Sequence, residues 1–304
     1  MFFYFLLAFV FILATKQKSI QYGDVYVDDT QIANSLKEVR GGSLIVEADG
    51  LRFPNLQNVE KLLRLEGAYQ IPADAFPKLK EVGGIEITSS VQKELKFDGL
   101  VFKSLTVEDS ALSSMTGLSD PTSIFQLVVR NSPISGLRFN SLTSIIQDMR
   151  VENCSQLVVQ EMIPAITKVG RIFRIYNSSD ETLQLPIQMI GFSFALAFNR
   201  KLTSVVLPLL TAVRSTLDVY DNPKLKSIEI PNLVNFGSFA NFDPLDSLII
   251  SKKALWTGYS RFTSNNFCKD YESTFAYTNF NYTLGIDCST PHKSEVFTHP
   301  HTHQ

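Results

Sequence analysis

A short phrase that recurs along the chain constrains its fold more than any other feature. The phrase is an apolar residue, Pro, any residue, Leu or Ile, any two residues, and another apolar residue. Such a phrase at a nearly fixed interval indicates stacked repeats, each too small to bury its own apolar face. The five copies occupy residues 53–59, 76–82, 163–169, 207–213 and 230–236.

A second phrase precedes each of these and alternates apolar and polar residues. Alternation with a period of two predicts a short strand with one face in the core. Its copies begin at Leu44, Leu63, Ile85, Leu105, Leu127, Met149, Phe173, Phe194, Leu217 and Phe239. The interval averages about 22 residues over about ten copies. The sequence therefore predicts an all-β solenoid with about three short strands and three corners per coil.

A stack of coils exposes its core at both ends, so both ends need a cap. At the N-terminal end, Asp29 supplies helix N-cap chemistry, and Ile32, Leu36 and Val39 would share one helical face. The glycines that begin at Gly41 would stop this helix. We predict a short capping helix over the first coil.

At the other end, aromatic residues crowd into a segment that also contains Cys268 and Cys288. These two cysteines could close a disulfide around the segment. We predict a capping layer over the last coil, with an aromatic platform for sugar or protein as the alternative. The last residues alternate His with other residues, and we expect a flexible polar tail rather than a metal site.

Residues 2–13 form an unbroken apolar run that is too short to span a bilayer. We predict a secretory signal peptide, cleaved near Ala14 or Ser19, with a retained anchor as the alternative. No transmembrane segment is expected after cleavage. The predicted divisions are a signal peptide (1–19), an N-terminal cap (20–42), the solenoid (43–250), an aromatic C-terminal cap (251–290) and a tail (291–304).

Three sequons agree with secretion, and they predict N-glycans at Asn153, Asn177 and Asn281. Asn153 and Asn177 also end strand phrases, where Asn favours a turn by tolerating the left-handed backbone region. The third cysteine, Cys154, is expected to be a buried small apolar residue rather than a reactive thiol.

Both phrases, joined by a turn Asn, are clearest in residues 199–213 and 222–233. Here the chain resembles the receptor L-domain superfamily, and within it the fungal cell-wall and sporulation-specific glycoproteins. The resemblance covers about residues 43–250 and implies a right-handed, leucine-rich-repeat-like solenoid that is extracellular and N-glycosylated. It also implies a role in wall organisation or ligand binding. Unlike those glycoproteins, the chain has no apolar tail after Cys288, so no GPI anchor is expected.

Parallel β-helices also include polysaccharide hydrolases and lyases, which need carboxylates that converge on one face. We interpret the candidates as turn and surface residues, and we predict neither catalysis nor a cofactor. The candidates are Asp28, Asp29, Asp218, Asp221, Asp243 and Asp246. A net charge of −2 with 19% charged residues also argues against a nucleic-acid partner.

The outward positions of the strand phrase suggest a binding face. Arg130, Arg150 and Arg174 are expected to stack on adjacent coils near Tyr176, with Glu108 and Glu152 interleaved. The alternative is an ordinary solvated face. We expect a secreted, non-enzymatic glycoprotein that binds an extracellular protein or a wall or matrix polysaccharide. The alternatives are a soluble, receptor-ectodomain-like binding module and a carbohydrate-active enzyme.

Overall fold

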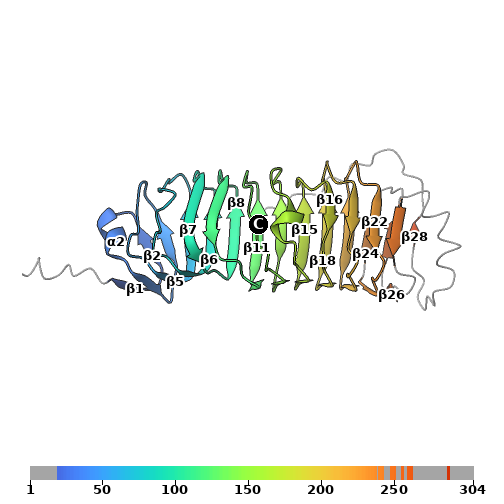
Figure 1. Cartoon of the computed structure of the whole chain (residues 1–304), viewed down its shortest axis with the longest axis horizontal. Coiled ribbons are helices and arrows are strands. Elements are labelled where there is room, and N and C mark those ends of the chain that lie inside the picture. Colours follow the sequence, from blue (N-terminus) through green and yellow to red (C-terminus); the bar gives the residue numbers. More distant parts are fainter. Residues whose placement is uncertain are drawn as a thin grey trace, which may run out of the picture.

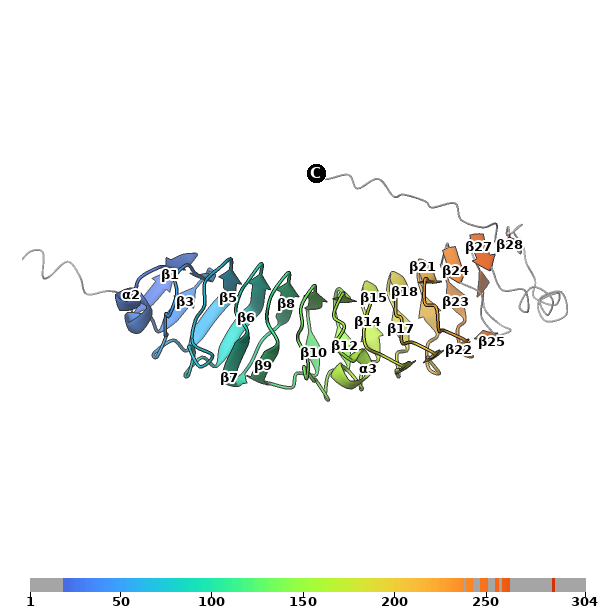
Figure 2. The same ribbon diagram turned by 90° about the horizontal axis from the view of Figure 1, so that it is seen from above.

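The computed structural model describes residues 19–237, 239–242, 247–250, 255–256, 259–262 and 286–287. In these residues the chain is a parallel β-solenoid of about ten turns, elongated along one axis (Figure 1). A view from above shows the coils side by side along that axis (Figure 2). The predicted solenoid is confirmed.

The largest sheet has 15 strands in the order β1-β3-β5-β6-β8-β11-β13-β15-β18-β21-β24-β27-β28, with β4 paired to β5 and β2 to β4. Its strands are β1 (Ile20–Tyr22), β2 (Val25–Val27), β3 (Glu38–Arg40), β4 (Leu44–Val46), β5 (Asn58–Glu66), β6 (Glu81–Thr88), β8 (Ser104–Glu108), β11 (Gln126–Arg130), β13 (Met149–Glu152), β15 (Ile172–Tyr176), β18 (Ser193–Ala197), β21 (Thr216–Tyr220), β24 (Phe239–Phe242), β27 (Tyr259–Phe262) and β28 (Ile286–Asp287).

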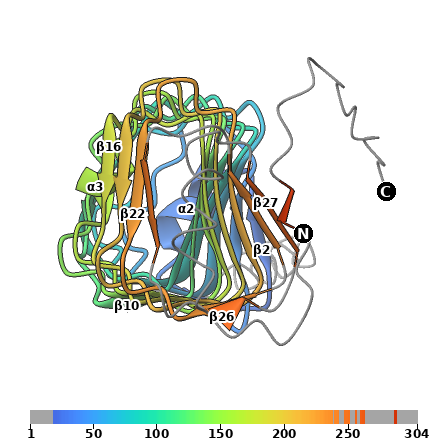
Figure 3. The same cartoon turned by 90° about the vertical axis from the view of Figure 1, so that its right-hand side faces the viewer.

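Two further sheets complete the coils, and the three sheets form walls around a common interior (Figure 3). The second sheet contains β10 (Ser123–Ile124), β12 (Ser144–Ile145), β14 (Lys168–Val169), β17 (Met189–Ile190), β20 (Ala212–Val213), β23 (Asn235–Phe236) and β26 (Leu255–Trp256). The third contains β16 (Thr182–Gln184), β19 (Ser204–Val206), β22 (Ser227–Ile230) and β25 (Ser247–Ile250). A pair, β7 (Glu94–Leu100) with β9 (Ser114–Leu118), lies outside these sheets.

The register of the main sheet follows the predicted strand phrases. Leu63 pairs with Ile85, and the pairing continues coil by coil as far as Phe194 and Leu217. The predicted position of the tenth strand phrase was wrong by one residue, because Leu217 pairs with Ala240 rather than with Phe239. The coil from Phe194 to Leu217 is one residue longer than the average interval, and the next coil, from Leu217 to Ala240, has the same length.

The recurring Pro phrase forms a tight turn in each of its five copies. The backbone N–H of Leu56 donates to the carbonyl of Phe53 at 3.3 Å, and the other four copies repeat this bond. Pro is at the second position of the turn, where its fixed φ is favourable and no N–H is required. The apolar residues on either side, such as Leu207 and Leu210, are fully buried. The phrase therefore both turns the chain and contributes to the core.

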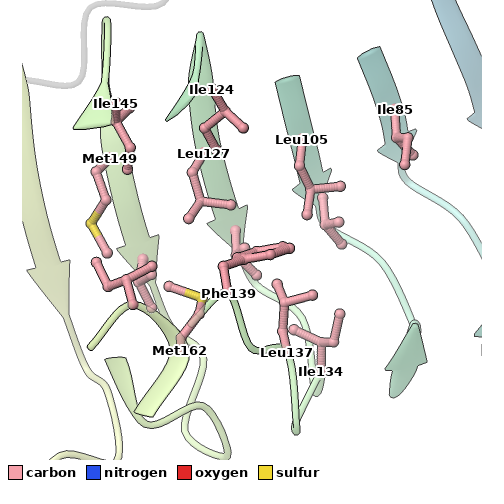
Figure 4. Close-up of a cluster of buried hydrophobic side chains, with 14 of the residues drawn as sticks. Ile85, Leu105, Ile124, Leu127, Ile134, Leu137, Phe139, Ile145, Met149 and Met162 are labelled. Carbon is pink, nitrogen blue, oxygen red and sulfur yellow. The ribbon is translucent and has the colours of Figure 1, made fainter. Parts of the chain in front are cut away.

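The core is one continuous cluster along the solenoid axis. Figure 4 shows Ile85, Leu105, Leu127 and Met149 on neighbouring strands, with Phe139 among the buried side chains below Leu127. Aromatic rings also stack between coils, and the ring centroids of Phe173 and Phe194 are 5.5 Å apart. Each coil thus covers the apolar face of the next, as the repeat pattern requires.

Among the residues that the structure describes, two short helices interrupt the strands. The first, α2 (Thr30–Ser35), begins at the predicted N-cap, where the Asp29 carboxylate accepts from the backbone N–H groups of Gln31 and Ile32. The predicted extension through Val39 was wrong, because Val39 belongs to β3, which pairs with β1 and β5. Interstrand hydrogen bonds override the helical pattern there. The second helix, α3 (Val159–Met162), is a single turn within a coil.

Several predictions fall outside the described residues. They concern the signal peptide, most of the aromatic C-terminal cap, the cysteines Cys268 and Cys288, the sequon residue Asn281, the carboxylates Asp243 and Asp246, and the tail. In the described part of the chain, no helix has both the length and the apolar character needed to cross a membrane.

Candidate functional site

The outer face of the main sheet presents two parallel rows of side chains. One row runs Arg64, Glu86, Thr106, Val128, Arg150, Arg174, Ala195 and Asp218, and the other runs Glu66, Thr88, Glu108, Arg130, Glu152, Tyr176, Ala197 and Tyr220. The predicted single stack of three arginines is therefore wrong. Arg150 and Arg174 are neighbours, but Arg130 lies in the other row, because it follows the last core residue of its strand whereas Arg150 and Arg174 precede theirs.

Carboxylates neutralise these arginines within the face. Arg130 lies between Glu108, at 2.7 Å, and Glu152, at 3.9 Å. Burial by itself lowers the pKa of Arg130, but the hydrogen bond and charge of Glu108 outweigh it and raise that pKa. Arg174 also contacts Glu152, at 3.4 Å, and Arg150 contacts the mostly buried Asp148 at 2.7 Å. The arginines are thus paired within the protein and do not require an anionic partner.

Three aromatic rings gather where the rows reach β15, β18 and β21. Phe198 lies between Tyr176 and Tyr220, with ring centroids 6.1 and 5.7 Å away and both contacts edge-to-face. The two tyrosine hydroxyls are 3.2 Å apart and share a hydrogen bond. Ala197, between the tyrosines in its row, is fully buried beneath them. We call Tyr176, Phe198 and Tyr220 the aromatic cluster.

Charged groups flank the aromatic cluster. The guanidinium carbon of Arg174 is 5.2 Å from the centre of the Tyr176 ring, within cation–π range. Asp218 lies two places along the same row as Arg174, beyond Ala195. Burial raises the pKa of Asp218, and the positive charge of Arg174 opposes that rise. Burial and the contact with Tyr176 raise the pKa of the Tyr220 hydroxyl well above its ordinary value.

The corner that follows each of the strands β5, β6, β8, β11, β13, β15, β18 and β21 holds one residue in the left-handed backbone region. Along successive coils these residues are Gly67, Ser89, Asp109, Asn131, Asn153, Asn177, Phe198 and Asp221, with φ between 47° and 81°. Glycine, Asn and Asp tolerate this region, whereas a bulky residue there is an outlier. We call this set the corner column, and Phe198 is its one bulky member.

Side-chain amides in the corner column form a ladder. The Nδ2 of Asn131 donates to Asp109 at 2.6 Å, and the Nδ2 of Asn153 donates to Asn131 at 2.8 Å. The last bond, from the Nδ2 of Asn177 to Asn153, is longer, at 3.4 Å. Phe198 occupies the next position and cannot continue the ladder. The predicted turn role of the two sequon asparagines is therefore confirmed.

An open hollow of about 610 Å³ lies beside this end of the ladder. It is lined by Asn153, Asn177, Phe198, Arg200 and Asp221, with Asn222 and Pro223 completing the wall. Phe198 is 47% exposed and connects the hollow to the aromatic cluster. Amides, one carboxylate, one guanidinium and an exposed ring thus meet in one place. Such a set can hydrogen-bond hydroxyl groups and pack against apolar faces.

Cys154 directly follows a residue of the corner column and is buried. The residues at the same position in other coils, Ser132, Ser178 and Asn199, are buried as well. The Cys154 thiol lies 3.3 Å from the backbone oxygen of Glu152, and burial raises its pKa. The expectation of a buried, unreactive cysteine agrees with this environment.

The carboxylates considered for catalysis lie in different settings. Asp218 belongs to an outer row of the sheet, whereas Asp221 lines the hollow at a corner with φ of 53°. Asp29 caps α2. Among the residues that the structure describes, no group of three or more His, Cys, Asp or Glu side chains is arranged to hold a metal ion.

The sequence analysis missed Phe198, Tyr220 and Arg200 as members of a site. A signal for Phe198 was present, because it occupies a strand-end position that other copies give to small or turn-forming residues. The alternation of Leu217, Asp218, Val219 and Tyr220 likewise places Tyr220 on the outer face. Their convergence with Tyr176 depends on the lateral register of three coils, which no local pattern reports.

Comparison with known proteins adds no relative. The chain matches no family model, no curated protein and no solved structure. The class established by the geometry is therefore that of a parallel β-solenoid of about ten coils, with an outward aromatic cluster beside a polar hollow.

Proposed function

We propose that this protein is a secreted or cell-surface, non-enzymatic glycoprotein that binds an extracellular protein or a wall or matrix polysaccharide. Its solenoid would be of the receptor L-domain type, and the outer face of the main sheet would be its binding surface. Solenoids commonly use one extended, rigid face in this way.

The observation that carries the proposal is the aromatic cluster beside a face whose arginines are paired with carboxylates. The hydroxyls of Tyr176 and Tyr220 share a partly buried hydrogen bond, and Arg174 lies against Tyr176. Tyr and Arg dominate the binding energy of many interfaces, because each combines apolar area with hydrogen-bonding groups. Glu108 and Glu152 are already occupied by arginines, which fits a role in holding the face rather than in acid–base chemistry.

The test begins with the full chain, tagged and expressed in a eukaryotic secretory host. Medium, membrane and detergent-resistant matrix fractions are compared, with and without glycosidase. We expect glycosylated protein outside the cell, with a fraction held in the matrix. Unglycosylated protein in the cytosol would overturn the proposal.

The binding surface is tested with the double variant Tyr176→Ser and Tyr220→Ser. We expect it to lose matrix retention while keeping the thermal stability of a folded chain. The matched control is Leu209→Ser, which changes an exposed apolar residue at a Pro turn away from the cluster. Equal retention of both variants would mean that the aromatic cluster is not the binding surface.

A second candidate function is a soluble, receptor-ectodomain-like module with one discrete protein partner. The compactness of the cluster favours it, because three rings and one arginine are confined to neighbouring coils rather than spread along the face. This candidate predicts free glycosylated protein in the medium and saturable binding of one protein. The same tyrosine variant would abolish that binding.

A further inference from the structure

The position of Phe198 is the starting point for a further inference, which rests on the proposed secretion and glycosylation. Phe198 adopts φ of 58° in a column where the other described corners use Gly, Ser, Asp or Asn. A bulky residue in this region is strained. Its edge-to-face contacts with the two tyrosines still leave 47% of the residue exposed.

Phe198 is also the immediate neighbour of a sequon asparagine. Tyr176 pairs with Ala197, so Asn177 and Phe198 follow on adjacent coils, which are spaced by about 4.8 Å. Asn153, Asn177 and Phe198 line the same hollow. A sugar attached to the Nδ2 of Asn177 would therefore begin its course beside an exposed aromatic ring.

The two sequons of the hollow differ in their surroundings. Asn153 has an amide on either side of it in the ladder, and its Nδ2 donates to Asn131 at 2.8 Å. Asn177 is the last amide of the ladder, its Nδ2 donates only over 3.4 Å, and its other neighbour is Phe198. Attachment of a sugar leaves one hydrogen on Nδ2, so the ladder bond is compatible with a glycan.

We propose that Asn177 carries an N-linked glycan whose first N-acetylglucosamine packs against Phe198 and occupies the hollow. The C–H groups of a pyranose ring carry slight positive charge and are attracted to the electron-rich face of an aromatic ring. Arg200 and Asp221 line the rest of the hollow and can hydrogen-bond the sugar's hydroxyl and acetamido groups. The glycan thus completes the outer surface at this corner.

The experiment uses full-length protein from a eukaryotic secretory host. Mass spectrometry of glycopeptides gives the occupancy of each sequon, and thermal melts give Tm. Ser179→Ala removes the Asn177 sequon and keeps the asparagine, while Ser155→Ala does the same for Asn153. Each is made in the wild-type chain and together with Phe198→Asn, which restores an ordinary corner residue. Unglycosylated protein from bacteria measures what each serine contributes by itself.

We expect Asn177 to be occupied, and loss of its glycan to lower Tm by about 2–4 °C, the size typical of one good contact in a domain of this length. In the Phe198→Asn background the same loss should have no effect on Tm. Trimming the glycan to its first sugar with an endoglycosidase should preserve Tm. Loss of the Asn153 sequon should change Tm little in either background.

Two outcomes overturn this inference alone. One is an unoccupied Asn177 in protein that is secreted and glycosylated elsewhere, and the other is an equal loss of Tm with and without Phe198. Protein that stays in the cytosol with no sequon occupied would instead contradict the proposed function itself.

Discussion

At the scale of single residues, each corner of the coil imposes its own requirement. Each residue of the corner column adopts the left-handed backbone conformation, and in most coils this residue is small or favours turns. At the corner after the second sheet, some neighbouring coils instead bring their backbones close together. There the backbone of one coil leaves no space for a side chain on Gly170 or Gly191 of the next.

Gly191→Ala tests this close approach. A Cβ at Gly191 would lie 1.9 Å from the carbonyl oxygen of Gly170, so the backbone must shift. We expect a loss of about 1–3 kcal/mol in the free energy of unfolding, measured by urea titration. The control is Arg214→Ala, at the same corner one coil further on, where the side chain is exposed. A loss no greater than that of the control would contradict the packing described here.

At the scale of elements, the Pro turn and the strand share the work of building each coil. In residues 207–213, Leu207 and Leu210 flank the turn and are fully buried, whereas Leu209 is 44% exposed. Another device joins one coil to the next. The carboxylate of Asp180 accepts from the backbone N–H groups of Val159 and Gln160, both at 3.0 Å, and so caps α3 from the following coil.

Leu210→Ala tests the core position of the turn. We expect it to lower the free energy of unfolding by about 2–5 kcal/mol, because the lost methyl groups leave a cavity between coils. Leu209→Ala, one residue away, should change it by no more than about 0.5 kcal/mol. Chemical denaturation of the two variants gives the comparison, and similar losses would show that the register of the turn is wrong.

Asp180→Asn tests the cap through pH. Burial raises the pKa of Asp180 above its unfolded value, despite the hydrogen bonds from Gln160 and Val159 that lower it. The contribution of this carboxyl to stability is therefore full below the unfolded pKa of about 3.9 and declines as pH rises through the folded pKa. We expect the stability of wild type relative to the variant to fall as pH rises from about 3.9 toward neutral. Urea titrations across this range measure it, and a rise would contradict the assignment.

At the scale of the whole molecule, stacking in register turns local sequence into long rows. Each coil contacts mainly its neighbours, so stability accumulates along the axis and the outer face stays rigid. Ion pairs between coils, such as Arg64 with Glu86 and Arg130 with Glu108, link neighbouring strands of this face. They hold its charges locally rather than exposing a field of one sign.

Arg130→Gln tests how much these links contribute. The side chains of Arg130 and Glu108 are 37% and 24% exposed, so solvent screens their attraction. We expect a loss of about 1 kcal/mol or less in the free energy of unfolding, and a smaller one at about 1 M salt. The control is Arg138→Gln, which removes an arginine that hydrogen-bonds within its own coil. A loss of several kcal/mol at either salt concentration would contradict this interpretation.

The sequence by itself determined the repeat, the core and the turns. Alternation, the Pro phrase and the turn asparagines are local, and each acts through backbone preferences or burial within one coil. Nine of the ten strand phrases therefore pair as predicted. The tenth differed because a slip of one residue changes the register without changing the pattern.

Only the tertiary structure decided which outward side chains meet. It separated Arg130 from the row of Arg150 and Arg174, ended α2 before Val39, and joined Phe198 to Tyr176 and Tyr220. These outcomes depend on lateral register, on competition between strand pairing and helix, and on contacts between residues about one coil apart. No local pattern encodes such contacts, because residues about 22 positions apart become neighbours only when the coils stack.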